Sequence, residues 1–376
     1  MHDRQRRRNR PTGIHLSLQR EPPRVALAPP SGLCYNGSLL DSTRHDLDSI
    51  RRVLVTRLRW LGDVVMSTPM LEVLREALPQ AQIEYLTAPA FAPALRGHPG
   101  CDRIHTLPLK PGVRATLAVV RQLRSPRIDW VFDTLGNPRS AVLVALTNPR
   151  HSVAPDRGLR TRLYEHQQSH RPGERSAVRH QLDMLTPLLG RVEVRPTSLF
   201  VEEEERQAVA GQLGIEREAE LVLLHPGATT AERAWPIDRW PGLIAELQHL
   251  APGIQVRVIS QPGWEAAAQQ IVERATGDVE RLPGLDLRPL MALLTEASLY
   301  IGNDGGILHT AVALRVPTVG IFGPTLKDVW FPYEDWGPYR GVNRSKKEAA
   351  APVDKVMEAV RSVGGRRWAG FRSHRK

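Results

Sequence analysis

The chain has 376 residues, 41% of them hydrophobic, which suffices for two domains of about 150 residues each plus tails. Its 51 Lys and Arg exceed its 40 Asp and Glu, and the net charge of +11 favours a polyanionic partner, either nucleic acid or an anionic membrane surface. No apolar run of about eighteen residues exists, which excludes a spanning helix. The two cysteines, Cys34 and Cys101, fit a reducing compartment and form no metal or redox motif.

Residues 1–50 are rich in Arg, Pro and Ser without a sustained period, so they are predicted to form a basic, disordered lead. Strand-like and helix-like segments then alternate, which predicts an α/β protein with parallel sheets buried on both faces. We expect one domain over 51–195, a second over 196–345, and a helix with a basic tail over 346–376. The stretch 151–179 reads as polar and turn-prone, and the acidic run Glu202–Glu205 as a helix start rather than a metal site.

Periodicity gives the expected elements. Strands are predicted at 53–58, 82–87, 103–107, 129–132, 221–224, 255–259, 299–302 and 318–322. Helices are predicted at 66–78, 114–124, 138–147, 178–189, 206–213, 238–250, 264–275, 287–296, 306–314 and 353–363.

The first candidate segment follows the first predicted strand, which runs into Arg59-Trp60-Leu61-Gly62-Asp63. Asp63 therefore sits near the carboxyl end of that strand, where open α/β sheets place their ligands. Capping of the next helix is the alternative role for such an aspartate.

The second segment is the loop after the 221–224 strand, His225-Pro226-Gly227-Ala228-Thr229-Thr230, which continues to Arg233 and Trp235-Pro236. The hydroxyls of Thr229 and Thr230 and the guanidinium of Arg233 are donors of the kind that a diphosphate needs. The alternative is a packed helix entry with Arg233 solvated.

The third segment is a strand that ends in Asn303-Asp304-Gly305-Gly306 and leads into a helix carrying His309. Glycines let the backbone turn tightly, and the helix start aims free N–H groups at an anion above it. Asp304 and His309 lie close enough in sequence to face one polar ligand. An ordinary strand-to-helix loop is the alternative.

These segments, together with Asp133–Ser140 and the ending Phe322-Gly323-Pro324-Thr325, resemble glycosyltransferase family 9, the lipopolysaccharide heptosyltransferases, over roughly Arg52 to Tyr333. The resemblance implies the GT-B architecture, in which two Rossmann-like domains face each other across a cleft. It implies inverting, metal-independent transfer of a sugar, expected to be heptose, from an ADP-sugar held by the second domain to a phosphorylated glycolipid or glycan held by the first. No cofactor and no nucleic acid are implied. The expected location is cytoplasmic, with peripheral contact at the inner face of the inner membrane.

The resemblance also implies roles for individual residues. Asp63 matches the family's proposed general base, and as a carboxylate with an ordinary pKa of about 3.9 it is ready to accept a proton at neutral pH. Arg233 stands where the family usually has Lys, and Gly305 where it more often has Thr or Ser. The expected donor-binding residues are Thr229, Thr230, Arg233, Glu265, Asp304, Gly305, Gly306 and His309.

Within that set, Thr229 and the two glycines are expected at the diphosphate, Asp304 at the sugar hydroxyls and Glu265 at the ribose. His309 is expected to approach the phosphates or to orient the turn. On the acceptor side the expected contacts are Arg57, Arg59 and Arg139, with solvated surface charges as the alternative reading of each.

Three other functions remain open. The first is transfer from a different nucleotide-sugar donor. The second is a dinucleotide-dependent enzyme, although no Gly-x-Gly-x-x-Gly follows a predicted strand. The third is nucleic-acid binding, suggested by the basic ends and disfavoured because the basic residues are not interleaved with aromatic ones.

Overall fold

The computed structural model describes residues 46–364 except 170–172, 174, 216–219, 326 and 344–349. These residues belong to one compact unit, His45–Lys376. The predicted basic tail from Arg366 and most of the predicted lead lie outside the described residues. The described chain opens with a 3-10 turn, η1 (Leu47–Ser49), and Ile50 is buried in the core, so residues 47–50 of the predicted lead belong to the folded part.

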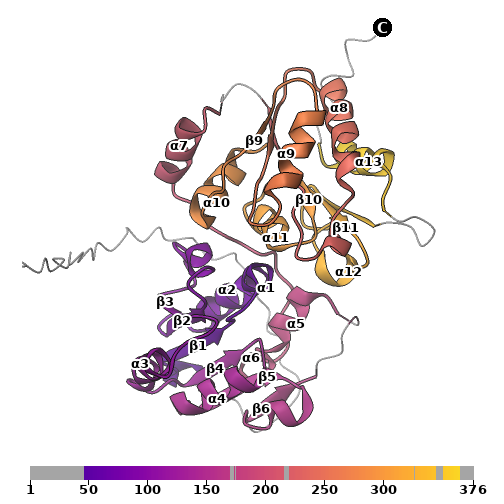
Figure 1. Cartoon of the computed structure of the whole chain (residues 1–376). Coiled ribbons are helices and arrows are strands. Elements are labelled where there is room, and N and C mark those ends of the chain that lie inside the picture. The colour runs from indigo at the N-terminus through magenta and orange to yellow at the C-terminus, as the bar shows by residue number, and fades with distance from the viewer. Residues whose placement is uncertain are drawn as a thin grey trace, which may run out of the picture. The chain divides into compact units, whose positions relative to one another are not determined.

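The first sheet contains six parallel strands in the order β3-β2-β1-β4-β5-β6 (Figure 1). Every residue of its two central strands is buried, because helices cover both faces of the sheet. The strands are β1 (Arg52–Thr56), β2 (Gln82–Thr87), β3 (Arg103–Thr106), β4 (Trp130–Asp133), β5 (His151–Pro155) and β6 (His166–Gln168).

The second sheet repeats this plan, with six parallel strands in the order β12-β11-β10-β7-β8-β9. Its central strands are also fully buried and rich in Leu, Val and Ile. The strands are β7 (Leu221–His225), β8 (Gln255–Val258), β9 (Val279–Arg281), β10 (Leu299–Asn303), β11 (Thr318–Phe322) and β12 (Tyr339–Asn343).

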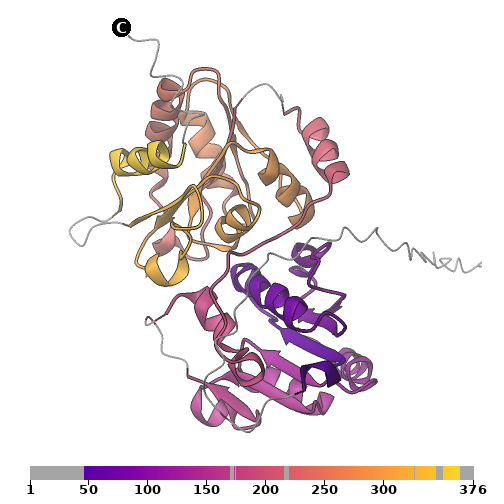
Figure 2. The same ribbon diagram turned by 180° about the vertical axis from the view of Figure 1, so that it is seen from behind.

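Helices connect the strands as parallel pairing requires. In the first half they are α1 (Leu61–Met66), α2 (Thr68–Ala77), η2 (Ala92–Leu95), α3 (Val113–Arg124), α4 (Pro138–Thr147), η3 (Gly158–Thr161), α5 (Ala177–Asp183) and α6 (Thr186–Leu189). In the second half they are α7 (Glu203–Gln212), η4 (Ala231–Arg233), η5 (Ile237–Arg239), α8 (Trp240–Leu250), α9 (Glu265–Arg274), α10 (Leu287–Glu296), α11 (Gly306–Ala313), α12 (Lys327–Trp330) and α13 (Val353–Val363). Figure 2 shows the same ribbon from behind, where α7 again lies beside α10.

Several predicted elements need correction. The stretch 151–179 contains β5 and β6, and the chain after Tyr333 contains β12, although both stretches read as polar. These are short strands at or near sheet edges, which carry little periodic signal. The predicted helices at 66–78 and 178–189 are each interrupted, and Pro69 stands in the first turn of α2.

The predicted fold class, α/β with parallel sheets, is confirmed. Apolar packing extends from one sheet to the other, since one core cluster includes both Val55 of β1 and Leu308 of α11. A smaller cluster joins Val65 of α1 to Ala313 of α11. Within the described ranges, no helix is long and apolar enough to cross a membrane.

Candidate active site

The starts of α1 and α11 pack against each other through two glycines. A Cβ atom on Gly62 would lie 2.6 Å from Cδ2 of His309, and one on Gly306 would lie 2.8 Å from Cβ of Leu61. Real side chains do not approach so closely, so only glycine permits this contact. The first and third sequence motifs, which are about 240 residues apart in the sequence, therefore form one site.

Asp63 lies in the first turn of α1 and is held by Arg57. Nη2 of Arg57 lies 2.7 Å from Oδ1 of Asp63, and both side chains are largely buried. Arg57 also donates from Nη1 to the carbonyl oxygen of Thr134 at 2.7 Å and from Nε to that of Arg59 at 3.2 Å. Asp63 is not the N-cap of α1, a position that Trp60 occupies, so the capping alternative is wrong.

Trp60 was not expected at this site and is unusual in two ways. Its backbone has a φ of 69°, a value that L-residues rarely adopt, and its side chain is 54% exposed. The guanidinium of Arg59 lies 5.6 Å from its ring, which is cation–π distance. Strained backbone next to a candidate catalytic residue is typical of functional turns.

An ion pair between Arg233 and Asp304 connects the second sequence motif to the third. Nη1 of Arg233 lies 3.6 Å from Oδ2 of Asp304, whose side chain is buried, whereas that of Arg233 is 41% exposed. Oδ2 of Asp304 has no hydrogen-bond donor within the described residues. Buried carboxylate oxygens normally have donors, so this atom is placed to accept from a ligand hydroxyl.

Asn303, for which the sequence suggested no role, fixes the loop that carries Arg233. Its Nδ2 donates to the carbonyl oxygen of Pro226 at 2.6 Å, and its Oδ1 accepts from the backbone N–H of Trp235 at 2.9 Å. A Cβ on Gly323 would lie 2.9 Å from the carbonyl oxygen of Glu232, so the turn after β11 supports the same loop. The contacts of Asn303 are with residues far away in the sequence, so no local sequence pattern indicated its role.

His309 is buried between the two helix starts. Its Nδ1 lies 2.9 Å from the hydroxyl of Tyr333, a second residue that the sequence did not single out. Burial lowers the pKa of His309, and the negative charges of Asp304 and Asp63 oppose that shift. Burial has the opposite effect on Tyr333, an acid that is neutral when protonated: it raises the pKa, so this hydroxyl keeps its proton. These contacts suit a residue that orients the turn, the second of the two expected roles.

The remaining expected donor residues line the same loops. Thr229 and Thr230 are exposed, Gly305 precedes α11 in extended conformation, and Gly306 begins it. Glu265 is the exposed first residue of α9. The indole N–H of Trp264, the residue before Glu265, donates to the carbonyl oxygen of Ala228 at 3.0 Å, so α9 begins beside the Thr229 loop.

Arg139 lies on α4 and does not share the surroundings of Arg57. It donates to the carbonyl oxygens of Pro108 and Leu109 and lines a hollow of about 490 Å³ between α3 and α4. Arg57, in contrast, uses its guanidinium to hold Asp63. The three expected acceptor-side arginines therefore have three different surroundings, since Arg59 lies over Trp60.

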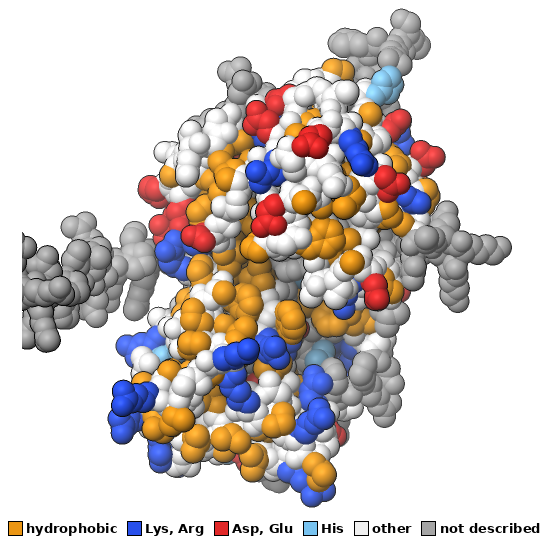
Figure 3. Space-filling view, viewed as in Figure 1, with side chains coloured by type: hydrophobic (Ala, Val, Ile, Leu, Met, Phe, Trp, Pro, Cys, Tyr) orange, Lys and Arg blue, Asp and Glu red, His pale blue; other side chains and the backbone are white. Residues whose placement is uncertain are grey.

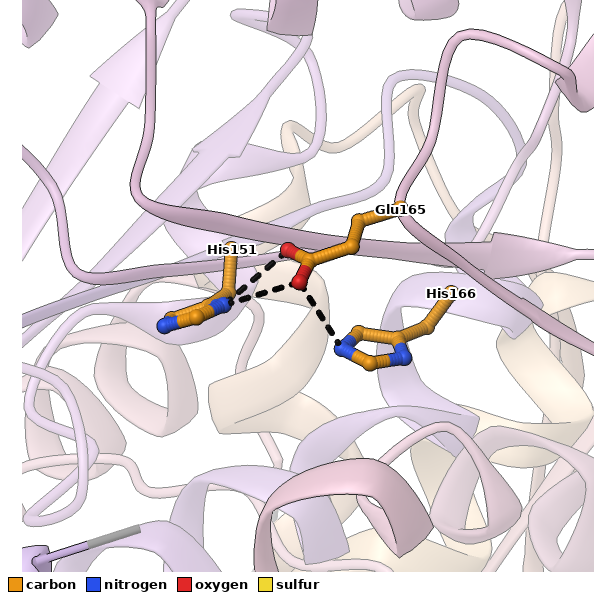
Figure 4. A group of neighbouring side chains, drawn as sticks. All are labelled: His151, Glu165 and His166. Carbon is orange, nitrogen blue, oxygen red and sulfur yellow. Dashed lines mark hydrogen bonds and ion pairs between the residues drawn. The ribbon is translucent and has the colours of Figure 1, made fainter. Parts of the chain in front are cut away.

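A separate group of titratable residues lies at the edge of the first sheet, formed by His151, Glu165 and His166 (Figure 4). Nδ1 of His151 lies 3.0 Å from Oε2 of Glu165, and Nε2 of His166 lies 3.6 Å from Oε1. These residues belong to none of the three motifs.

Comparison with known proteins gives a consistent result. Residues 116–356 match the model of glycosyltransferase family 9 (heptosyltransferase). Lipopolysaccharide heptosyltransferase 3 of Escherichia coli is 24% identical over 340 residues, covering 81% of this chain and 96% of that protein. Lipopolysaccharide heptosyltransferase 1 of Pseudomonas aeruginosa is 26% identical over 300 residues, covering 73% and 79%.

Solved structures show the same fold. A family 9 glycosyltransferase from Veillonella parvula superposes with a TM-score of 0.76 at 21% identity, covering 85% of this chain and 99% of that one. ADP-heptose lipopolysaccharide heptosyltransferase II of E. coli gives a TM-score of 0.73 at 19% identity, with the same coverage. The predicted GT-B architecture is therefore confirmed.

Proposed function

Because the chain belongs to glycosyltransferase family 9, we propose that it transfers heptose from ADP-heptose to an acceptor of the lipopolysaccharide core. Its relatives are named as lipopolysaccharide heptosyltransferases, and a related E. coli structure holds an ADP-heptose analogue. The observation that carries the proposal is the packing of Gly62 against His309, which brings a carboxylate to the edge of an anion-binding helix start.

In this proposal Asp63 is the general base. It takes the proton of the acceptor hydroxyl as that oxygen attacks the anomeric carbon, and the bond from this carbon to the diphosphate breaks with inversion. Arg57 holds Oδ1 of Asp63 at 2.7 Å, so Oδ2 is the oxygen that receives the proton. The ion pair with Arg57 fixes the carboxylate in one orientation, which favours proton transfer from a correctly placed acceptor hydroxyl.

The departing ADP carries the negative charge that the second half of the site must stabilise. Arg233 supplies a permanent positive charge, and the N–H groups at Gly305 and Gly306 supply neutral donors. Thr229 and Thr230 add hydroxyls, and Glu265 is proposed to contact the ribose. Oδ2 of Asp304 is buried and has no hydrogen-bond donor among the described residues, and it is proposed to accept a hydrogen bond from a hydroxyl of the heptose.

The acceptor is proposed to approach from the first half, where Arg59, Trp60 and Arg139 are exposed. A phosphorylated glycolipid acceptor suits the guanidinium groups, which bind phosphate through paired donors. We expect the enzyme in the cytoplasm, with peripheral contact at the inner face of the inner membrane, and without nucleic acid as a partner. Transfer is proposed to proceed without a metal ion.

A donor panel tests the proposal directly. ADP-heptose, ADP-glucose, a UDP-sugar and a GDP-sugar are each incubated with the chain and a soluble core acceptor, and release of the nucleoside diphosphate is measured. We expect acceptor-dependent release of ADP from ADP-heptose well above that from the other donors. Preferential turnover of a UDP- or GDP-sugar would instead assign a different donor to this site.

A further inference from the structure

Exposed large hydrophobic side chains are confined to one half of the described chain. All ten exposed large hydrophobic residues lie between Trp60 and Phe200, and the described part of 201–364 has none. Seven of them come from three neighbouring segments, namely the loop before α3 with α3 itself, α4, and η3 with the residues that follow it. The seven are Leu109, Val113, Leu117, Val142, Leu146, Leu159 and Leu163. We call this region the α3–α4–η3 surface.

The helix α3 shows how unusual this surface is. Of its twelve residues only Val120 and Leu123 are buried, whereas Val113 is 75% exposed and Leu117 is 45% exposed. These two lie four positions apart, so they project from the same side of the helix. Contiguous exposed apolar side chains on a folded protein commonly mark a docking site.

The same surface is basic and almost free of acids. Residues 103–128 and 134–155 contain no Asp or Glu, yet they carry Lys110, Arg114, Arg121 and Arg139 among others. The first acid beyond them, Asp156, accepts from the backbone N–H of Gly158. Residues 51–200 hold 22 Lys and Arg against 12 Asp and Glu, while 201–376 hold 21 against 23. Residues 51–200 thus carry an excess of ten positive charges, compared with three in residues 1–50 and five in residues 366–376.

Figure 3 shows this difference on one face of the molecule. Blue side chains gather with orange ones over the part that Figure 1 labels α3, α4 and β6, and red side chains are concentrated over the part labelled α7 to α9. Between α3 and α4 the hollow of about 490 Å³ is lined by apolar Leu107, Val142 and Leu146 and by basic Lys110 and Arg139. Apolar walls with a cationic rim match a lipid, whose chains are apolar and whose headgroup is anionic.

We propose that the α3–α4–η3 surface docks the enzyme on an anionic phospholipid bilayer. Exposed aliphatic side chains would enter the interface while arginines contact phosphate groups, an arrangement typical of peripheral membrane proteins. Such docking would bring the site to a membrane-bound acceptor, and in that sense it rests on the proposed function. A polynucleotide would use the charges but not the exposed Val and Leu, so the bilayer fits better.

The test is co-sedimentation of the full chain with vesicles of phosphatidylglycerol and phosphatidylcholine, and of phosphatidylcholine alone. One variant combines Arg114→Gln, Arg121→Gln and Arg124→Gln, and a second combines Val113→Gln, Leu117→Gln and Leu159→Gln. All six side chains are exposed, so folding should be retained, and circular dichroism checks it. The matched control carries Arg274→Gln and Arg361→Gln, which are exposed on α9 and α13.

We expect the native chain to bind the anionic vesicles and the arginine variant to bind at least tenfold more weakly at low salt, with a smaller dependence on salt. The apolar variant should also bind more weakly, but with the native salt dependence, and the control should bind like the native chain. Native-like binding by both variants would overturn the proposal. Transfer to a soluble acceptor should be unchanged in every variant, so a failure of docking is distinguishable from a failure of the proposed activity.

A second, independent observation concerns the group in Figure 4. The rings of His151 and His166 both stack on the buried indole of Trp130, with centroids 4.5 Å and 5.6 Å from it. Nε2 of His166 is buried without a hydrogen-bond partner and faces the carboxylate of Glu165. Two oriented imidazoles and a carboxylate form a ligand set that suits Zn²⁺.

The distances support this assignment. The candidate ligand atoms all lie within 4.8 Å of one another, and the carboxylate lies 3.0 Å and 3.6 Å from the two ring nitrogens. Neighbouring ligands of a tetrahedral zinc ion are about 3.3 Å apart, given bonds of about 2.0–2.1 Å. We infer that His151, Glu165 and His166 bind one Zn²⁺ ion, which would link β5 to the edge strand β6. The three residues have no recognisable metal-ligand spacing in the sequence, which predicted no metal site.

Titration of the tag-free chain with Zn²⁺ by calorimetry tests the inference, with the visible spectrum of Co²⁺ as a second readout of coordination. We expect one ion per chain, and binding at least tenfold weaker in His166→Ala and in Glu165→Gln. His249→Ala, an exposed histidine on α8, is the control and should bind like the native chain. Absence of binding, or equal binding in all four proteins, would overturn the inference.

Discussion

The two halves of this enzyme share one architecture but differ in their surfaces. Residues 51–200 carry an excess of ten positive charges and all the exposed large hydrophobic side chains among the described residues. The second half has nearly balanced charge, and its bulky apolar side chains are buried or partly buried wherever they are described. The same sheet-and-helix plan thus carries two different surfaces, of which we propose that the first half faces a lipid-linked acceptor and the second half binds the nucleotide.

The site repeats this difference at the level of single residues. In the first half Arg57 is committed to holding Asp63, and both are largely buried. In the second half Arg233 remains 41% exposed, and its Nη1 lies 3.6 Å from Oδ2 of Asp304, which has no hydrogen-bond donor among the described residues. The first ion pair is close, at 2.7 Å, whereas the second is longer, at 3.6 Å. This contrast supports our proposal that the reacting proton is taken in the first half and that the donor sugar nucleotide binds in the second.

The largest effect is expected for Asp63→Asn. Loss of the base should reduce turnover by on the order of a hundredfold or more, because an amide does not accept the hydroxyl proton. Circular dichroism should remain native, since the amide oxygen can still accept from Arg57. Turnover measured with saturating donor is the readout, and a rate close to that of the native enzyme would remove Asp63 from the mechanism.

The next effect concerns His225, the last residue of β7, which precedes the loop that carries Thr229. Burial lowers its pKa to about 4, compared with about 6.5 in the unfolded chain. Between these values the unfolded chain takes up a proton that the folded chain does not. Stability should therefore fall as the pH decreases from about 6.5 to 4, with a contribution from His225 of up to about 3 kcal/mol.

Urea unfolding at several pH values measures this contribution in the native chain and in His225→Gln. The variant should lose less stability across that pH range, although His98, whose pKa is also lowered to about 4 by burial, keeps part of the dependence. Identical pH dependence in the two proteins would contradict the assignment.

A smaller effect is expected where the two halves touch. Gly62→Ala places a methyl group 2.6 Å from His309, so it should destabilise the fold by roughly 1 to 3 kcal/mol and lower turnover. The control is Gly242→Ala in α8, where a Cβ would meet nothing within 4 Å. If both substitutions have the same effect on the unfolding midpoint, the close contact of α1 and α11 is not needed.

The smallest effect is expected from removal of the lead. A chain that starts at Ser49 retains the buried Ile50, so it should fold and transfer sugar to a soluble acceptor at the full-length rate. Its binding to anionic vesicles should fall modestly at low salt, because the lead carries part of the positive charge while the α3–α4–η3 surface remains. Unfolding of the truncated chain would show that the lead belongs to the enzyme.

Much of the fold was predictable because its main elements are long or fully apolar. Strands such as β7 and β10 and helices such as α10 appear close to their expected bounds. The short strands β5, β6, β9 and β12 were not predicted. They are three to five residues long and take their structure from pairing with a neighbour, which a local sequence pattern does not encode.

The site was predictable only in part, for a related reason. The positions of Asp63, Asp304 and Gly306 follow from strands that end in short polar or glycine turns. The Arg57–Asp63 pair and the Asn303 bridge depend on how chain segments meet in space, and the sequence spacing does not reveal either. Tyr333, more than twenty residues after His309, was missed for the same reason.

Calorimetric titration of ADP into four proteins tests the division of roles most directly. The proteins are the native enzyme, Asp63→Asn, Arg233→Ala and Arg233→Lys. We predict that Asp63→Asn binds ADP like the native enzyme, that Arg233→Ala binds at least tenfold more weakly, and that Arg233→Lys keeps most of the affinity, because the charge is retained. Equal affinity in all four proteins, or a greater loss in Asp63→Asn than in Arg233→Ala, would contradict the account.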